Sequence, residues 1–371
     1  MSAVDKVVLP DGRAVWMVSE YALARQLMND PRFSNDTARM GDKAPLAALP
    51  PTVRTVVAQD MLNTDPPQHT RLRQLVAHRF TGRSANAMRP VVDEIAERLL
   101  DGLDTAAETD LVAQYAQPLP TLVLGAMIGI PEADCPDVRR WSDTFVSELL
   151  LISDSLLDAT TSLLDYAAEL VRRKRREPGQ DLISELIEAN LTDDELSSMV
   201  FVLLIAGQTA TTQLIAKALY LLLTNPDQRD AVRADETLLG GAVDEALRLE
   251  PPLQVSAFRM TQESLTIGDT CIPAGEVVLC SLTAVNRDKS RFTAPDSFDV
   301  RRDDNQHLSF GFGIHRCLGA NLAKVEAEAA LGALLRRYSS PRITASAGDL
   351  PWVEAGIMRK LMALPVRLGA K

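Results

Sequence analysis

The sequence contains few cysteine, histidine and aromatic residues. Its 371 residues include four cysteines and four histidines, and aromatic residues make up 5%. Four cysteines in so long a chain do not make a disulfide framework, so we expect reduced thiols. The C-x-x-C spacing of a zinc or iron–sulfur site is absent around Cys317. A G-x-S-x-G elbow and a G-x-G-x-x-G turn after a strand are also missing, which disfavours a hydrolase and a nicotinamide-binding fold.

Long apolar runs and an excess of positive charge are missing too. The longest apolar stretch, residues 199–206, is far shorter than the roughly 20 residues that span a membrane. The N-terminal sequence MSAVDK has no secretory pattern, so we expect a cytoplasmic protein with no membrane partner. The net charge of -11 argues against a nucleic-acid partner. The one basic run, residues 172–176, could be a nucleic-acid patch, but its place at the end of an amphipathic helix favours cations that complement the helix dipole.

The stretch FGFGIHRCLG, residues 310–319, places Cys317 directly before a helical sequence. A thiolate at a helix N-terminus is favoured by the helix dipole and by free backbone N–H groups, which predicts a lowered pKa and suits a metal. Gly313 and Gly319 would allow close approach of a large flat ligand, and Phe310 offers an aromatic face. One axial cysteine and a flat ligand together indicate haem, whereas an arbitrary cysteine would more often be a buried structural residue.

This stretch resembles the F-x-x-G-x-x-x-C-x-G signature of the cytochrome P450 family, the haem-thiolate monooxygenases. The resemblance runs from about residue 15 to 360 and implies a mainly α fold with a small β region, a triangular helical prism around haem, in a single domain over residues 1–371. Members usually carry a longer segment before the first hairpin, so this chain has a short N-terminus. The expected regions are a helix-rich part at about 84–250, a sheet-rich part at about 6–18 and 255–305, and a haem-thiolate loop at 310–319.

Periodicity and turn signals divide the helix-rich part further. The expected helices cover residues 85–103, 111–128, 137–151, 155–176, 182–189 and 192–223. Residues 6–18 alternate around Pro10-Asp11-Gly12 and predict a hairpin. By the resemblance, the leucine-rich region 145–164 forms a mobile lid over the substrate, although its periodicity alone fits ordinary helix packing equally well.

Further residues match positions that bind haem in this family. His69 and Arg73 stand four apart on one helix face and resemble the H-x-x-x-R pair that binds propionates, although such a pair is otherwise often only a solvated face. Arg259 and His315 are further matches, so two arginines and two histidines would balance two carboxylates in an apolar pocket. The implied contacts of haem b, iron protoporphyrin IX, are His69, Arg73, Arg259, Phe310, Gly311, His315, Gly319 and Cys317, the iron ligand.

The expected helix 192–223 departs from the family at the place where dioxygen is activated. The family has A-G-x-[Asp/Glu]-Thr, and this chain has Thr209 at the acid position and Ala210 at the alcohol position. The usual proton relay is therefore incomplete, unless Thr211, Thr212 or a substrate hydroxyl completes it. Alternatively, the threonines bond back to the helix. Gly207 inside such a helix costs about 1 kcal/mol of stability relative to alanine. We therefore expect the cofactor or dioxygen to approach closely at Gly207. The implied catalytic segment comprises Ala206, Gly207, Thr209, Ala210 and Thr211.

Three other residues resemble a structural motif of the family. Glu245 and Arg248 form an E-x-x-R pattern before Pro251-Pro252, and Arg302 matches the third member. A Glu–Arg pair three residues apart is usually a surface feature worth a few tenths of a kcal/mol. The resemblance instead implies a buried network, which we assign to core stability.

The resemblance implies a monooxygenase that hydroxylates or epoxidises a small organic substrate with dioxygen, in secondary metabolism. Electrons would come from a ferredoxin and an NAD(P)H-dependent ferredoxin reductase, docking on a basic patch of Arg71, Arg79, Arg83, Arg316 and Lys324. The substitutions at Thr209 and Ala210 leave an alternative open, namely oxidative coupling, cyclisation or peroxide-driven chemistry. A third alternative is a haem protein that binds a ligand without turnover.

Overall fold

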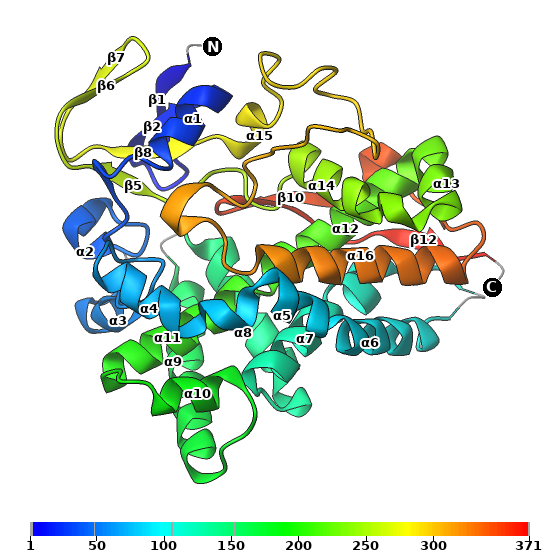
Figure 1. The fold of residues 1–371 in the computed structure, drawn as a ribbon, viewed down its shortest axis with the longest axis horizontal. Coiled ribbons are helices and arrows are strands. Elements are labelled where there is room, and N and C mark those ends of the chain that lie inside the picture. The colour runs from blue at the N-terminus through cyan, green and yellow to red at the C-terminus, as the bar shows by residue number, and fades with distance from the viewer. Residues whose placement is uncertain (1–2, 48, 105–106, 151–152, 370–371) are drawn as a thin grey trace.

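The computed structural model of the protein describes residues 3–47, 49–104, 107–150 and 153–369. Helices dominate the fold, and the largest sheet lies at one side, where N-terminal strands meet strands of residues 259–280 (Figure 1). The α-helices are Tyr21–Leu27 (α1), Thr37–Met40 (α2), Pro51–Val57 (α3), Gln68–Ala77 (α4), Gly82–Ala87 (α5), Arg89–Asp101 (α6), Pro118–Ile128 (α7), Cys135–Glu148 (α8), Asp154–Arg176 (α9), Leu182–Glu188 (α10), Asp193–Ala206 (α11), Thr209–Thr224 (α12), Pro226–Ala234 (α13), Leu239–Leu249 (α14), Leu282–Val285 (α15) and Ala320–Arg337 (α16).

The strands are short and form four small sheets among the described residues. They are Val4–Val8 (β1), Ala14–Val18 (β2), Phe33–Ser34 (β3), Thr109–Asp110 (β4), Arg259–Thr261 (β5), Leu265–Ile267 (β6), Thr270–Ile272 (β7), Val277–Cys280 (β8), Arg342–Ile343 (β9), Trp352–Ala355 (β10), Met358–Leu361 (β11) and Pro365–Arg367 (β12). The largest sheet has the order β1-β2-β8-β5-β3, in which only β2 and β8 run parallel. The expected hairpin of residues 6–18 is confirmed as β1 and β2.

The sheet-rich part differs from the expectation at both ends. Residues 281–305 were expected to belong to it, but they contain α15 and irregular loops and no strand. Strands β9 to β12, at residues 342–367, were not expected; they form the hairpin β10–β11 and, with β4, the sheet β4-β12-β9. Most of these strands are two to four residues long, which is too short for a visible alternation of apolar and polar residues.

Prolines divide two of the expected helices. The expected helix 85–103 is α5 followed by α6, and Pro90 stands in the first turn of α6. The expected helix 111–128 is a π-helical turn, Val112–Ala116 (η3), followed by α7, which begins at Pro118. Proline has no backbone N–H and is tolerated in the first turn of a helix, so each of these prolines begins a helix instead of continuing one.

The expected helix 192–223 also consists of two helices. Thr192 begins it with a capping box to Glu195, as its sequence favours. Helix α11 ends at Ala206 and α12 begins at Thr209, so the helix is interrupted at Gly207 and Gln208. No proline lies at this break, where the side-chain amide of Gln208 donates to the carbonyl of Leu204.

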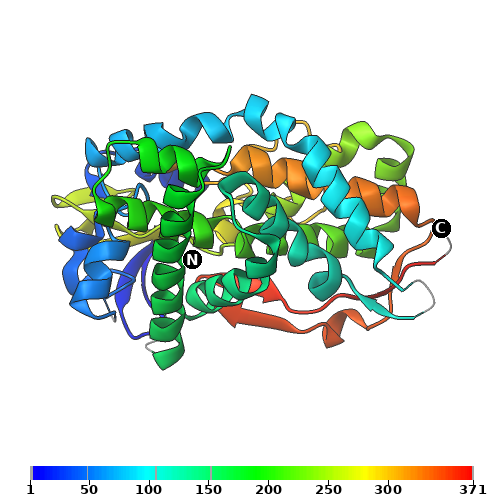
Figure 2. The ribbon, with the colours of Figure 1, turned by 90° about the horizontal axis from the view of Figure 1, so that it is seen from below.

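Helices α11 and α12 form the centre of the helical part. Together they are apolar and long enough, with a hydropathy of 1.6 over the most apolar window, to cross a membrane by composition. However, 78% of that window is buried inside the fold, where α12 packs on α14 and α16 and α11 packs on α8 and α9. Such burial is typical of a core helix. In the view from below, α9 (green) stands across the other helices of that face (Figure 2).

Candidate functional site

The loop of residues 310–319 lies between the sheet and the helical part, in orange beside the start of α16 (Figure 1). The backbone N–H of Cys317 donates to the carbonyl of Phe310 over 2.7 Å and closes the loop. Phe310 packs against the main hydrophobic core, and its ring centroid lies 5.8 Å from that of His307. The loop therefore holds Cys317 at a fixed place just before α16, as its sequence predicts.

Two glycines of this loop have different surroundings. Gly313 has a φ of +77°, and a Cβ there would lie 2.7 Å from the backbone oxygen of Met28. The positive φ and the close packing of the loop on α1 both require glycine here, and the approach of a flat ligand at Gly313 stays a prediction. A Cβ at Gly319 would meet nothing within 4 Å, so open space adjoins the loop on that side.

Burial governs the pKa of Cys317. Burial raises the pKa of its thiol, while the backbone N–H groups of Gly319 and Ala320, together with Arg316 and Arg73, lower it by less. The expected net lowering of this pKa is therefore wrong, and a bound cation is what would favour the thiolate. The side chain lies deep in the fold and is nevertheless accessible, which places it on the wall of an internal space.

Four basic side chains gather beside this loop, as expected. His69 and Arg73 come from α4, Arg259 from the start of β5 and His315 from the 3-10 turn Gly313–His315 (η6). The ring centroids of His69 and His315 are 4.3 Å apart. Burial, followed by the neighbouring cations His69, Arg259 and Arg73, lowers the pKa of His315 to about 3. Burial likewise lowers the pKa values of the other three groups.

Unpaired nitrogen atoms show which ligand this cluster suits. Both ring nitrogens of His69 and Nε of Arg259 are buried without a hydrogen-bond partner. Leaving such a group unsatisfied costs about 1–3 kcal/mol. The carboxylate of Asp65 acts on the pKa of His69 and of Arg259 in the raising direction, against the effect of burial. This carboxylate already accepts hydrogen bonds from the Ser34 hydroxyl and the backbone N–H of Asn35. A ligand that brings carboxylates would satisfy these nitrogens and balance the charge.

The residues present therefore fit haem, which combines propionate carboxylates with an iron that takes a thiolate. Among the residues that the structure describes, no group of three or more His, Cys, Asp or Glu side chains is placed to hold a metal ion. A thiolate site built from a single cysteine is thus consistent with the arrangement, and a multi-ligand metal site is not.

The segment predicted to act on dioxygen lies at the break between α11 and α12. Ala206 is exposed and Ala210 is half-buried, although both belong to core helices, so an open space adjoins this side of the break. Thr209 and Thr211 are only 5% and 6% exposed. Within the described part of the chain, neither hydroxyl makes a hydrogen bond, so the alternative in which they bond back to the helix is not seen.

Gly207 is explained by helix packing. A Cβ at this position would lie 3.3 and 3.4 Å from the two terminal methyl groups of Leu124 on α7. These contacts are tighter than a side chain normally allows, so the glycine lets α7 approach the break. This contact is one reason for the glycine, and the expected approach of cofactor or dioxygen stays a prediction.

The three residues assigned to core stability do form one buried network. Arg248 and Glu245 are fully buried, and Arg248 donates to both carboxylate oxygens of Glu245 over 2.7 Å. Nε of Arg302 donates to the same two oxygens over 3.1 Å. Arg248 also donates to the backbone oxygens of Asn286 and Pro295, so the network ties α14 to the segment that follows α15.

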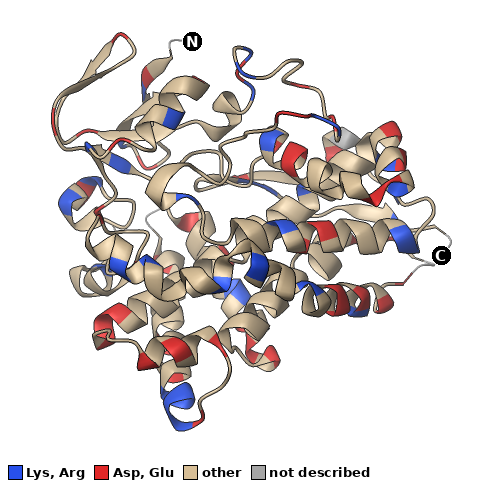
Figure 3. Ribbon diagram, in the orientation of Figure 1, with Lys and Arg blue, Asp and Glu red and all other residues tan. Residues whose placement is uncertain are grey.

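The basic patch and the basic helix end both prove to be largely paired with acids. Of the five patch residues, Arg71 pairs with Glu195, Arg79 with Glu185 and Lys324 with Asp244. At the end of α9, which appears blue among red neighbours in Figure 3, each cation of the run 172–176 has a carboxylate within 4 Å. The alternative of a nucleic-acid patch at this run has no support in these contacts.

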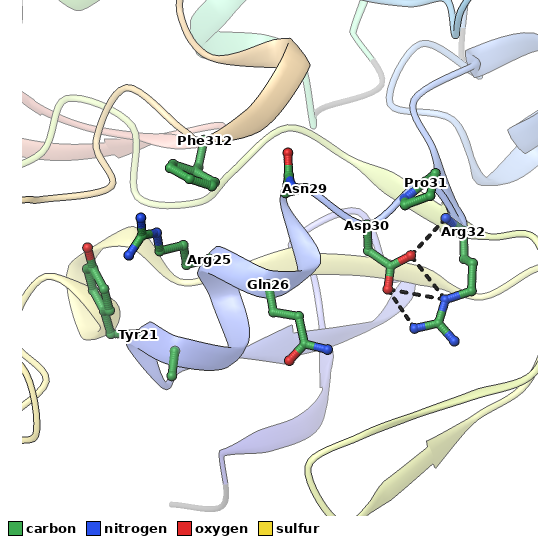
Figure 4. Close-up of a pocket in the computed structure, with 9 residues that line it drawn as sticks. Tyr21, Arg25, Gln26, Asn29, Asp30, Pro31, Arg32 and Phe312 are labelled. Atoms are coloured by element: carbon green, nitrogen blue, oxygen red, sulfur yellow. Dashed lines mark hydrogen bonds and ion pairs between the residues drawn. The ribbon is translucent and has the colours of Figure 1, made fainter.

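A surface hollow of about 760 Å³ lies on the outer side of the cysteine loop, between α1 and Phe312 (Figure 4). The guanidinium of Arg25 stacks over the Phe312 ring, with 4.7 Å to its centroid, and Arg32 pairs with Asp30. None of the predicted haem ligands lines this hollow, so it is separate from the internal space beside Cys317.

Two polar residues near the site were missed by the sequence analysis. Gln208 is 1% exposed and hydrogen-bonds to α7, α8 and α11, which no local spacing reveals. Glu326 on α16 is 2% exposed, its Oε2 has no partner, and burial raises its pKa well above the usual value. Glu326 lies in an alanine-rich helix, and the only available signal was its position on the face shared with Leu322 and Ala330.

Comparison with known proteins gives a consistent result over the whole chain. Residues 124–344 match the family model named Cytochrome P450. The chain is 40% identical to cytochrome P450 107B1 of Saccharopolyspora erythraea, over 99% of this chain and 92% of that protein, and 40% identical to the cytochrome P450 monooxygenase PikC of Streptomyces venezuelae, over 98% and 87%. The solved structure of the tirandamycin C-bound P450 monooxygenase TamI superposes with a TM-score of 0.92 at 38% identity, over 99% of this chain and 94% of that one.

These matches confirm the mainly α fold with small sheets and identify the enzyme class as a monooxygenase that uses haem-thiolate chemistry, dioxygen, an organic substrate and redox partners. The relatives are bacterial, and they cover almost the full length of the chain. The chain belongs to the cytochrome P450 family.

Proposed function

We propose that the protein binds haem b through Cys317 and hydroxylates or epoxidises a small organic substrate of secondary metabolism. The observation that carries this proposal is the cluster of buried, unpaired basic groups beside Cys317, whose side chain is accessible. When bound, the haem supplies dioxygen activation, and its electron-donating thiolate favours cleavage of the O–O bond. The remaining functions, which are binding, orientation and proton supply, fall to the residues of the chain.

The proposed contacts follow from the geometry of the site. His69, Arg73, Arg259 and His315 hold the propionates, since they are the basic side chains that converge beside the loop. Phe310, Gly311 and Gly319 flank the sulfur side, where Gly319 leaves open space. Ala206 and Ala210 leave room for dioxygen and substrate on the opposite side, between the two halves of the broken helix. We assign the whole chain, residues 1–371, to one domain around this site.

The substrate class is supported by the named relatives. TamI was solved with tirandamycin C bound, and the sequence of this chain is 38% identical to it. Ala206, which is exposed, and Ala210, which is half-buried, present small apolar side chains at the break and so leave room for a bulky, largely apolar molecule. The predicted lid, residues 145–164, covers the end of α8 and the start of α9, and residues 151–152 between them lie outside the described residues. Its role as a lid stays a prediction.

We further propose a ferredoxin and an NAD(P)H-dependent ferredoxin reductase as the electron donors, in the cytoplasm. Arg83 and Arg316 are exposed near the cysteine loop and remain candidates for docking. Arg71, Arg79 and Lys324 already pair with carboxylates, so we expect the docking surface to be smaller than the five residues first suggested.

The experiment that tests the function is reduction of the purified, haem-loaded protein under carbon monoxide. A thiolate-ligated iron gives a red-shifted Soret band, which we expect from the native protein and not from C317A. A panel of small molecules, scored by displacement of the iron-bound water in the oxidised protein, then identifies substrates for turnover with ferredoxin, its reductase and NADPH. A native protein without the red-shifted band, or a C317A variant that retains it, would contradict the proposal.

A second proposal, atypical chemistry, is favoured by one observation. The alcohol position, Ala210, is half-buried at the break and carries no hydroxyl, and the acid position is occupied by Thr209, which cannot ionise. Coupling, cyclisation or peroxide-driven reactions depend less on proton delivery from this helix. Product formed with hydrogen peroxide in place of NADPH and ferredoxin would support this alternative. A ligand-binding protein without turnover would instead give the spectra and no product with either oxidant.

A further inference from the structure

The break between α11 and α12 is stabilised by a side chain that replaces a backbone donor. In a continuous helix the carbonyl of Leu204 would accept the backbone N–H of residue 208, four positions later. In this structure it accepts Nε2 of the Gln208 side chain over 2.5 Å and Oγ of Ser142 over 3.0 Å. Both donors are fixed in the interior, because Gln208 is 1% exposed and Ser142 is fully buried. The free carbonyl at the break is thus satisfied without a continuous helix.

The other end of the Gln208 side chain is also held. Oγ1 of Thr121 on α7 donates to Oε1 of Gln208 over 3.0 Å, and Thr121 is 2% exposed. Nε2 of Gln208 lies 3.4 Å from Oγ of Ser142 on α8, within hydrogen-bond reach. Oε1 of Gln208 can only accept a hydrogen bond, and the Thr121 hydroxyl can donate one, whereas the Leu204 carbonyl needs a donor such as Nε2. These two partners therefore fix the orientation of the Gln208 amide. One glutamine therefore connects the break to α7 and α8.

Helix α8 is also connected to the region over the open space. Ser142 lies three residues before Phe145, whose ring packs edge-on against Phe201 of α11 with centroids 5.3 Å apart. Nζ of Lys360 on β11 donates to both carboxylate oxygens of Asp143, the residue after Ser142. A displacement of α8 would therefore change the hydrogen bond between the Ser142 hydroxyl and the Leu204 carbonyl.

We propose that Gln208 is a positioning residue that keeps the helix open beside Ala206 and Ala210, and that Ser142 makes this opening depend on the position of α8. The inference rests on the proposed function, because the open space is assigned there to dioxygen and substrate. Without the side-chain amide, the backbone N–H of residue 208 can return to the Leu204 carbonyl, and the space beside Ala206 narrows. Gln208 touches neither iron nor substrate in this proposal and acts through the shape of the helix.

The test compares Gln208→Leu with Gln213→Leu in the haem-loaded protein. Gln213 is a matched control, because it is 2% exposed on α12 and its amide bonds the backbone N–H and carbonyl of Leu361, away from the break. The C–O stretching frequency of carbon monoxide on the reduced iron reports on the space beside Ala206. The affinity of imidazole for the oxidised iron reports on the width of the space beside Ala206. Thermal unfolding measures the stability of both variants.

We expect Gln208→Leu to shift or split the C–O band and to weaken imidazole binding by about tenfold, the equivalent of roughly one buried hydrogen bond. Ser142→Ala should shift the band in the same direction by less, and Ser142→Thr, which keeps the hydroxyl, should restore it. Gln213→Leu should lower thermal stability and leave the band unchanged. Equal C–O bands and imidazole affinities in all variants would overturn the proposal and leave Gln208 a purely structural residue.

Ser142→Ala and Thr121→Val keep the test decisive if Gln208→Leu does not fold. Each removes one hydroxyl from the network, and an unchanged C–O band in both would equally overturn the proposal. The native spectrum tests the proposed function separately, because the red-shifted Soret band depends on Cys317 and not on Gln208. A native protein that has this band, with variants that do not alter the C–O frequency, rejects the positioning role alone.

Discussion

The imidazole ring of His69 lies against that of His315, with centroids 4.3 Å apart and planes tilted by 49°. The two residues are 246 positions apart in the sequence, and burial lowers the pKa of both. Two buried basic rings in contact, with the nitrogens of one unpaired, form a site that lacks an anion. The haem propionates are the anions that we assign to it.

We therefore expect His69→Leu to weaken haem retention. Leucine has a similar volume but donates no hydrogen bond, and a bond to a charged acceptor contributes about 1.5–3 kcal/mol, so haem should dissociate about tenfold faster or more. Transfer of haem to excess apomyoglobin measures this rate. His78→Leu is the control, because His78 is exposed and pairs with Glu185 at the surface. Equal transfer rates for the native protein and His69→Leu would show that His69 does not hold the cofactor.

Glu245→Gln should unfold the protein far more readily than an equivalent change at the surface. The amide keeps the size of the carboxylate but leaves buried Arg248 and its neighbour Arg302 without an anion, which costs about 3–5 kcal/mol. Asp137→Asn offers a control with the same spacing, since Asp137 and Arg140 pair three residues apart with both side chains more than 60% exposed. That change should cost less than about 1 kcal/mol. Urea unfolding measures both, and similar losses would contradict the assignment of the network to core stability.

Lys217 gives a prediction about pH. It is 1% exposed on α12, its Nζ donates to the carbonyl of Pro251, and burial lowers its pKa from 10.5 to about 8. The unfolded chain therefore binds more protons than the folded protein between these two values, and stability should rise with pH across this range. The difference between the two pKa values corresponds to about 3 kcal/mol at most.

Lys217→Met removes this titration. The free energy of unfolding of the native protein should rise relative to that of the variant as the pH increases from 7 to 10. Parallel urea unfolding of both proteins at each pH measures the difference, which cancels the effect of other titrating groups. A constant difference across this range would show that Lys217 is charged in the folded protein.

Local spacing was sufficient for the parts of the site that one segment encodes. Cys317 and its loop, and the His69–Arg73 pair on one helix face, were predicted because each depends on residues fewer than ten apart. The network of Gln208 could not be predicted, because Ser142 and Thr121 reach it from two other helices. In the sequence, the apolar run through residue 206 continues into a further helical pattern, and nothing marks the break.

The same limit explains the error in the pKa prediction and the packing contacts that were missed. The helix N-terminus acts on Cys317 as expected, but burial outweighs it, and burial depends on the whole fold. Gly207 and Gly313 were assigned to ligand approach, and the structure adds a packing reason for each, namely the methyl groups of Leu124 beside Gly207 and the backbone oxygen of Met28 beside Gly313. Sequence predicted that these glycines were needed and could not identify the contact.

Ala210→Thr tests whether the missing hydroxyl limits turnover. Residue 210 is half-buried beside the open space, so a threonine there can place its hydroxyl where water and dioxygen would lie. We expect more product per NADPH consumed, with the ligand that displaces the iron-bound water most completely as substrate. Thr209→Val should change this ratio little, because the Thr209 side chain is 5% exposed and makes no hydrogen bond among the described residues.

The combination of Thr209→Glu with Ala210→Thr restores the family pattern, and it separates the two functional proposals. A carboxylate at residue 209 must be buried, so we expect it to lower stability by itself and to raise coupling only together with the new hydroxyl. A rise in product per NADPH in the double variant supports an ordinary monooxygenase with an incomplete relay. If neither Ala210→Thr nor the double variant changes this ratio, proton delivery from this helix does not limit the reaction, which favours the atypical chemistry instead.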